Sequence, residues 1–562
     1  MPRPPRPQAS RPASLAARAV TVEIGDRTIL DAIDLAVTPG DRIGVVAPNG
    51  TGKSTLLRVL AGEVLPTAGE VTSAPPDANV GLLAQEHQHR PGERVRDLLA
   101  RRTGVEQAAG ELDAATSALA GEEAGADERY AAALDRWMAL GGADLDARLG
   151  PVWADLGLAP ELLDLDTAAL SGGQRARTAL AGLLLSRFDV LLLDEPTNDL
   201  DFDGLDRLEA FLDSVSAGVV LVSHDRAFLA RSVTAVLELD EHTHRGRRFD
   251  GGWAAYLDER AVARRHAEEA YDGFASRRAD LEQRIRTQRQ WAVQGVAKAK
   301  RTPRDNDKAQ RDFKLNRTEK QAAKVRQSEK ALVRLDAVDK PWEGWELRFE
   351  IAAAPRSGAV SFRLDAVVVE RGDFRLGPVH LDVRWGERVA LVGANGSGKT
   401  TLLDTVLGRL PLAGGERWIG PGVVVGEVDQ GRALLAGATG GGSATLLSAF
   451  CAAAGQDVTS EARSLLAKFG LGAGHVARPV RTLSPGERTR AVLAVLQARG
   501  VNCLVLDEPT NHLDLPAIEQ LEAALDRFPG TLLLVSHDRS LLAAVRVDRT
   551  LVIERGQLRS RD

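Results

Sequence analysis

The chain has 562 residues, of which 44% are apolar and 27% are charged, and its formal net charge is −6. This length allows two to four domains, and the composition is typical of a soluble globular protein. Two cysteines are too few for a disulfide framework, a zinc site or an iron–sulfur cluster, so a reducing, cytoplasmic compartment is expected. No apolar run reaches the 18 residues of a membrane-spanning helix, and the N-terminal stretch lacks the apolar core of a signal peptide, so no membrane contact is expected.

The first motif in chain order is a glycine-rich loop, APNGTGKS, at residues 47–54. It follows a β-branched apolar run and precedes a helical pattern, which is the context that a phosphate-binding loop needs. Its glycines allow backbone N–H groups to close around phosphates, and the helix N-terminus adds positive potential. Lys53 would reach the phosphates, and the Ser54 hydroxyl would bind Mg²⁺. Ala47 replaces the usual first glycine of the loop. Its methyl group is expected to be tolerated if φ at this position is negative.

Four motifs occur twice in the same order, so the chain is a tandem duplication. The phosphate loop is followed by LSGGQ at 170–174 or LSPGE at 483–487, then by a strand ending in Asp-Glu, then by Ser-His-Asp. The apolar runs before the acidic pairs, at 190–193 and 504–506, predict buried parallel strands, and chemistry gathers at the carboxyl ends of such strands. Both halves are therefore predicted to be α/β.

Two segments distinguish the halves from simple repeats. Residues 105–148 hold ten Asp and Glu but three Arg, and they predict helices that project from the first half or a somewhat larger helical subdomain. Residues 261–340 hold 21 Lys and Arg against 12 Asp and Glu. This basic segment predicts two long helices with a tip near Gly295–Asp305 and an anionic polymer as partner. A solvated coiled coil that only joins the halves is the alternative.

The order of the eight motifs resembles the ATP-binding-cassette family over nearly the whole chain. With a Gly/aromatic stretch at 248–256 leading into the basic segment, the arrangement resembles the ABC-F translation factors. The resemblance implies two nucleotide-binding domains joined by a long α-helical hairpin. We expect a disordered tail at 1–14, a first cassette at 15–250, the linker at 251–345 and a second cassette at 346–562.

The resemblance also implies two composite ATP sites, in which each signature serine completes the site of the opposite cassette. Asp194 and Asp507 would hold Mg²⁺, and Glu195 and Glu508 would polarise the attacking water. His224 and His537 resemble the family's switch histidines; a structural role is the alternative for each. The residues expected to bind ATP are Asn49, Gly50, Gly52, Lys53, Ser54, Thr55, Gln85, Ser171, Gly173, Asn395, Gly396, Gly398, Lys399, Thr400, Thr401, Gln430, Ser484 and Gly486. The residues expected to hold Mg²⁺ are Ser54, Gln85, Asp194, Thr400, Gln430 and Asp507.

Adenine in this family often stacks on an aromatic residue upstream of the phosphate loop, and neither half shows an obvious one at the expected place. Pro485 and Glu487 replace a glycine and a glutamine of the first signature, so the two sites need not be equivalent.

ABC-F linkers enter the exit-tRNA site of the ribosome and approach the peptidyl-transferase centre, so ribosomal RNA and tRNA are the expected partners of residues 261–340. The LSPGERTR signature resembles that of ABC-F members that protect ribosomes from macrolide- or lincosamide-type drugs, and this resemblance favours antibiotic resistance by ribosome protection. A housekeeping translation factor, in which 105–148 meets a basic ribosomal protein, and a soluble ATPase subunit of an exporter remain alternatives. The two cassettes are expected to pair within one chain, as a monomer.

Overall fold

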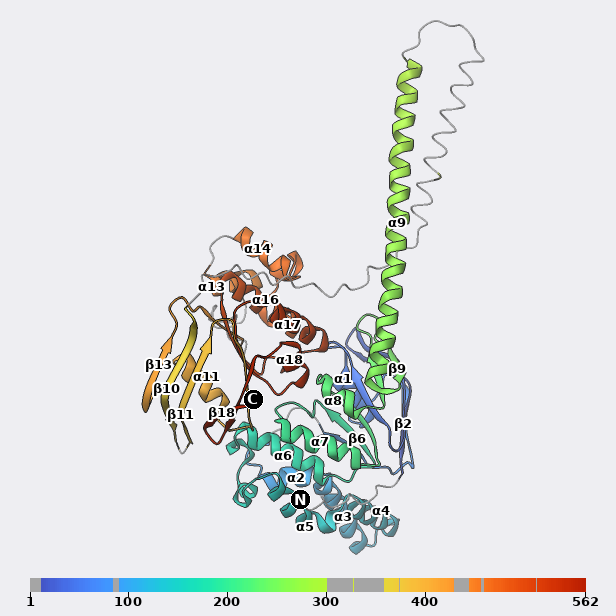
Figure 1. The fold of residues 1–562 in the computed structure, drawn as a ribbon. Helices are drawn as coiled ribbons and strands as arrows, with labels where there is room; N and C mark the ends of the chain where they lie inside the picture. The colour runs from blue at the N-terminus through green and yellow to red at the C-terminus, as the bar shows by residue number, and fades with distance from the viewer. Residues whose placement is uncertain are drawn as a thin grey trace, which may run out of the picture. The chain divides into compact units, whose positions relative to one another are not determined.

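The computed structural model describes residues 12–83, 90–300, 327, 358–372, 374–428, 444–455, 459–511 and 513–561. The chain folds into two compact units. One unit is formed by residues 1–254 with 345–562, and the other by residues 255–344. The first unit contains both predicted cassettes, and each of these has the same two sheets (Figure 1).

The first cassette is built on a six-stranded sheet in the order β5-β6-β7-β3-β8-β9, in which every pair except β8–β9 is parallel. Its strands are β3 (Arg42–Val46), β5 (Val80–Leu83), β6 (Val190–Asp194), β7 (Gly218–Val222), β8 (Ala235–Leu239) and β9 (Gly246–Asp250). A smaller antiparallel sheet has the order β2-β1-β4, from β1 (Ser14–Ile24), β2 (Arg27–Val37) and β4 (Ala68–Ala74). Strands β6 and β7 are buried along their whole length, as expected for central parallel strands.

Helices complete the first cassette. They are α1 (Lys53–Leu60), α2 (Val95–Arg102), α3 (Val105–Ala120), α4 (Ala126–Ala139), α5 (Leu145–Asp155), α6 (Gly172–Leu185), α7 (Phe202–Ser214) and α8 (Arg226–Ser232), with short 3₁₀ turns at Gly142–Asp144, Pro160–Asp164 and Thr167–Ala169. The acidic segment 105–148 is helical, as predicted, and α3 packs against α4. These two helices and the edge strand β5 line a cavity of about 1310 Å³.

The second cassette repeats this plan with the orders β14-β15-β16-β12-β17-β18 and β11-β10-β13. Its strands are β10 (Val360–Arg371), β11 (Phe374–Arg384), β12 (Arg388–Val392), β13 (Gly414–Ile419), β14 (Val425–Val428), β15 (Cys503–Asp507), β16 (Thr531–Val535), β17 (Arg549–Glu554) and β18 (Gln557–Arg561). Its helices are α11 (Lys399–Leu407), α13 (Leu446–Ala454), α14 (Thr459–Lys468), α15 (Ala473–Val476), α16 (Pro485–Ala498), α17 (Leu515–Arg527) and α18 (Arg539–Ala544), with a 3₁₀ turn at Val480–Thr482.

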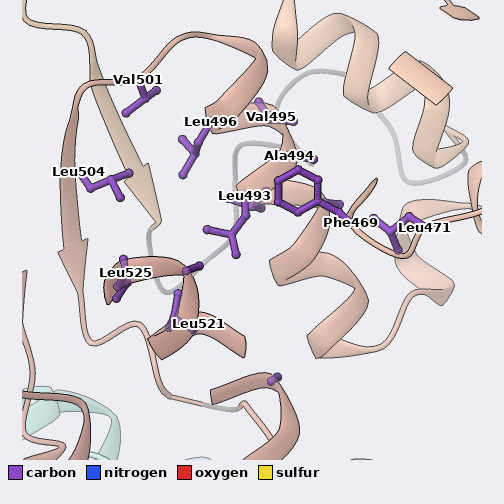
Figure 2. Close-up of a cluster of buried hydrophobic side chains, with 14 of the residues drawn as sticks. Phe469, Leu471, Leu493, Ala494, Val495, Leu496, Val501, Leu504, Leu521 and Leu525 are labelled. Carbon is purple, nitrogen blue, oxygen red and sulfur yellow. The ribbon is translucent and has the colours of Figure 1, made fainter. Parts of the chain in front are cut away.

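The helical part of the second cassette packs around an apolar core (Figure 2). Leu493 and Leu496 of α16 lie in this core with Leu521 of α17, and Phe469 after α14 is 2% exposed. Burial of each such side chain stabilises the fold by roughly 1.5–3 kcal/mol. The core therefore fixes the position of α16, whose N-terminus carries the second signature serine.

Helix α9 (Gly252–Lys300) has 49 residues, which corresponds to about 70 Å at 1.5 Å per residue. The break predicted between Gly295 and Pro303 does not occur at Gly295, because the helix continues through it to Lys300. A single glycine in a long helix costs only about 1 kcal/mol relative to alanine, which the flanking turns can absorb. The predicted tip beyond Lys300 and the predicted second linker helix fall outside the described residues. None of the described helices combines the length and the apolarity that crossing a membrane requires.

Candidate ATP sites

Both phosphate loops run from the end of a central strand into a helix, β3 to α1 and β12 to α11. Gly52 has φ 104° and Gly398 has φ 110°, a region that side chains with a Cβ rarely adopt. A Cβ at Gly52 would lie 2.7 Å from Ile29 Cγ2, and one at Gly398 would lie 2.6 Å from Phe374 Cζ. These close contacts explain why glycine stands at the last loop position in both halves.

Phe374 of β11 lies beside the phosphate loop of the second cassette. Its ring edge packs on Gly398 in the second cassette, whereas Ile29 holds the matching position beside Gly52 in the first. The surfaces beside the two loops therefore differ in chemistry.

Ala47 is accommodated as expected. It is buried, and its φ is not positive. At the matching Gly393, a Cβ would lie 2.4 Å from the carbonyl oxygen of Ile553. The methyl group is thus compatible with the first loop but not with the second.

The loop lysines and the hydroxyl–carboxylate pairs lie at the same places in both halves. Lys53 Nζ donates to the carbonyl oxygen of Ala47 at 2.9 Å, and burial lowers its pKa. Thr400 Oγ1 donates to Asp507 Oδ2 at 3.0 Å. Asp194 accepts a hydrogen bond from Ser54, which opposes the rise in the Asp194 pKa caused by burial. Oxygen atoms of hydroxyl and carboxylate groups are the ligands that Mg²⁺ prefers. The Ser54–Asp194 and Thr400–Asp507 pairs therefore both fit this ion.

Glu195 and Glu508 each follow the last residue of a buried strand. Their backbones lie in the left-handed region, with φ 50° and 45°. The amide of Glu195 donates to the Val222 carbonyl at 3.0 Å, and that of Glu508 donates to the Val535 carbonyl at 2.9 Å. Non-glycine residues in this conformation are strained by about 1–3 kcal/mol and cluster at functional sites. Burial raises the pKa of each carboxyl to about 7, with the nearby lysine acting in the opposite direction.

The switch histidines lie beside these carboxylates but make different contacts. His224 Nε2 lies 3.1 Å from Glu195 Oε1. His537 Nε2 lies 3.5 Å from Glu508 Oε1 and 2.9 Å from Lys399 Nζ. Burial lowers the pKa of His224 to about 3 and that of His537 to about 4, and the neighbouring lysine adds to both shifts. Both imidazoles are therefore neutral at pH 7.

Hydrogen bonds connect each phosphate loop to the opposite cassette. The amide of Asn395 donates to Asp201 Oδ2 at 2.9 Å, and Asn395 Nδ2 donates to the Asp199 carbonyl at 2.6 Å. Reciprocally, the amide of Asn49 donates to Asp514 Oδ2 at 3.1 Å. Sequence reasoning missed these aspartates, although both end the repeated motif after the acidic pair. The available signal was that the motif after the acidic pair ends in Leu-Asp in both halves, at Asp201 and Asp514.

The signature of the first cassette lies against the phosphate loop of the second. A Cβ at Gly173 would be 2.9 Å from Asn395 Cβ. Ser171 caps α6 and accepts from the Gln174 amide, and Ser484 caps α16 and accepts from the Glu487 amide. A cavity of about 700 Å³ adjoins Gly173, Glu195, His224, Thr400 and His537, so the predicted residues of both halves meet around it.

The remaining predicted residues follow the loops or lie outside the described part of the chain. Thr55 and Thr401 are in the first turns of α1 and α11, and Gly486 is in the first turn of α16. Gln85 and Gln430, which are expected to bind ATP and Mg²⁺, fall outside the described residues. Glu487 contacts Arg478 at 3.1 Å and His475 at 3.3 Å, pairings that follow from its replacing the glutamine of the first signature.

Comparisons with known proteins agree with this arrangement. The ABC transporter family model matches residues 30–198 and 376–511. The tylosin resistance ATP-binding protein TlrC of Streptomyces fradiae is 37% identical over 94% of this chain and 95% of its own. The energy-dependent translational throttle protein EttA of Mycobacterium tuberculosis is 33% identical over 92% of this chain and 87% of its own. ABC transporter F family member 5 of Arabidopsis thaliana is 29% identical over 94% and 73%.

Among solved structures, one titled RNase-L Inhibitor covers 97% of this chain and 90% of its own with a TM-score of 0.54 and 19% identity, a likeness of fold alone. The tandem cassettes, the paired sites and the relatives identify the chain as an ATPase of the ABC-F family.

Proposed function

We propose that this ATPase binds the ribosome near the exit-tRNA site and acts through its linker on the peptidyl-transferase region, as an antibiotic-resistance factor that protects ribosomes. The observation that carries the proposal is the basic linker, with a net charge of +9 over 261–340 in a chain whose net charge is −6. Such a segment is suited to a phosphate backbone, because each neutralised phosphate releases a counterion.

The names of the relatives bear on two candidate roles, antibiotic resistance and housekeeping translation. TlrC is named for tylosin resistance and spans nearly the same length as this chain. EttA is named as a translational throttle, which favours a housekeeping translation factor as the second candidate function. In that case the acidic helices α3 and α4 would meet a basic ribosomal protein.

In the proposed mechanism, the residues of one phosphate loop and the opposite signature would together bind ATP at each site. Asp194 and Asp507 would hold Mg²⁺, which would neutralise charge on the phosphates, and Glu195 and Glu508 would accept a proton from the attacking water. The two cassettes would stay together while both sites hold ATP and would separate after hydrolysis. The left-handed backbone at both glutamates and the hydrogen bond from Asn395 to Asp201 support these roles.

The test is a translation assay with purified ribosomes and macrolide, lincosamide, streptogramin A or pleuromutilin drugs. The proposal predicts rescue of translation for at least one of these classes. Absence of rescue for all four, with ribosome binding retained, would favour the housekeeping role. Co-purification with membranes instead of ribosomes would favour an exporter subunit.

A second experiment examines the linker. Neutralising Lys298, Lys300, Arg301 and Arg304 should weaken ribosome binding and reduce its salt dependence, because fewer counterions are released. The ATPase activity without ribosomes should stay the same. Unchanged binding with an unchanged salt slope would leave the linker as a spacer between cassettes.

A further inference from the structure

One aromatic contact distinguishes the second ATP site from the first. The ring of Phe202, in the first cassette, lies 5.1 Å from the ring of His537, in the second, with an interplanar angle of 74°. This edge-to-face geometry is a favourable arrangement of two aromatic rings. Phe202 directly follows Asp201, whose carboxylate accepts from Asn395 of the same site.

A cation also contacts the Phe202 ring. The Arg539 guanidinium carbon lies 5.6 Å from the centre of the Phe202 ring, within the range of a cation–π interaction. Arg539 also pairs with Asp206 at 2.6 Å and with Glu209 at 3.2 Å. Phe202, Asp206 and Glu209 are spaced four and three residues apart on α7, so one face of this helix receives Arg539.

At the first site, the position that corresponds to Phe202 holds an aliphatic residue. The chain places Leu515 after Asp514, where the first half places Phe202 after Asp201. Arg226, which matches Arg539, pairs with Glu522 of α17. The arginine contacts thus recur in both directions across the cassettes, whereas the aromatic contact belongs to the second site.

The two histidines also differ in what their Nε2 atoms contact. Lys399 Nζ is 2.9 Å from His537 Nε2, and an ammonium group can only donate, so His537 accepts there through an unprotonated Nε2. His224 Nε2 instead lies 3.1 Å from Glu195 Oε1. The histidine that contacts Phe202 is therefore the one directed toward the phosphate-loop lysine.

We propose that Phe202 is a positioning residue of the second site, which holds the His537 ring in its orientation toward Lys399 from the opposite cassette. Hydrolysis at this site then depends on the pairing of the cassettes more strongly than hydrolysis at the first site does. The inference rests on the proposed role of His537 in hydrolysis and does not involve the ribosome.

The test uses single-turnover ATP hydrolysis with protein in excess, in full-length variants that each retain one proposed base. In a Glu195→Gln background, Phe202→Leu should slow hydrolysis between about twofold and tenfold, the range that a lost aromatic pair produces. Phe202→Tyr should restore the rate, since it keeps the ring. In a Glu508→Gln background, Phe202→Leu should leave the rate unchanged.

Two further measurements separate positioning from packing. Histidine ¹³C NMR should show a ring-current shift for His537, assigned with His537→Ala, that Phe202→Leu abolishes and Phe202→Tyr retains. The affinity for ATP, from titration of a fluorescent analogue, should not change. Equal slowing in both backgrounds, or an unshifted His537 signal, would overturn the inference. If His537→Ala itself leaves the Glu195→Gln rate intact, the role of His537 fails and the inference fails with it.

Discussion

Asn395 and Asp201 are hydrogen-bonded across the two halves of the duplication, with the Asn395 amide 2.9 Å from Asp201 Oδ2. The same carboxylate caps α7, because its Oδ1 accepts from the Gly204 amide at 3.0 Å. One aspartate therefore joins the start of a helix in the first cassette to the phosphate loop of the second. This double use explains why an acidic residue, with two acceptor oxygens, stands at this position.

Replacement of Asp201 by Asn separates these two roles. Asparagine keeps one acceptor oxygen, which can still cap α7, but its amide group cannot accept from Asn395. We expect the melting temperature of the nucleotide-free protein to change little. Steady-state ATP turnover should fall about tenfold or more, since a hydrogen bond to a charged group contributes roughly 1.5–3 kcal/mol. Turnover equal to that of the wild type would show that the Asn395 contact does not matter for hydrolysis.

Gly173→Ala tests the contact between the first signature and the second phosphate loop. The added Cβ would lie 2.9 Å from Asn395 Cβ and would force the two cassettes apart at this point. We expect reduced ATP turnover with an unchanged melting temperature. Gly172→Ala is the matched control, because a Cβ there has no neighbour within 4 Å. Equal effects of the two substitutions on turnover would contradict the proposed contact.

Asp225 gives a prediction about pH. Burial raises its pKa to about 6, Asp538 adds to the rise, and the bond from the Phe228 amide opposes it. Since the folded state binds this proton more tightly than the unfolded state, the group favours folding less as the pH rises from 4 to above 6. Asp225→Asn should therefore raise the melting temperature relative to wild type at pH 8, and less so at pH 5.

Thermal unfolding followed by circular dichroism at both pH values checks this expectation. Asp41→Asn is a useful control, because Asp41 is a partly exposed carboxylate whose Oδ2 accepts from the Thr38 amide at 2.8 Å. A melting temperature for Asp225→Asn that is lower than wild type at pH 8 would contradict a raised pKa at this position.

Much of the site could be predicted from the sequence because most of its functional residues lie in short contiguous motifs. The lysine, hydroxyl, aspartate and glutamate positions follow from the order of a phosphate loop and a strand ending in two acidic residues. The pairing of each signature with the opposite loop came from the family resemblance. The contact of Gly173 with Asn395 agrees with it.

Other features depend on tertiary contacts that no local pattern encodes. Glu195 has a left-handed backbone, and its amide donates to Val222 of the neighbouring strand β7. Phe374 lies beside Gly398, 24 residues further along the chain, through the packing of β11 on the phosphate loop. The contact of Phe202 with His537 joins residues 335 positions apart, and a lone aromatic residue after the aspartate motif is equally typical of helix packing.

The measurement that tests the account most directly combines ATP turnover with ribosome co-sedimentation in the Glu195→Gln, Glu508→Gln double variant. Without its two proposed bases the protein should still bind ATP but hydrolyse it at least about 100-fold more slowly, the lower end of what general-base catalysis contributes. The closed state should then persist, and the variant should sediment with ribosomes in ATP at higher occupancy than the wild type. Turnover at the wild-type rate, or loss of ribosome binding in ATP, would contradict the account.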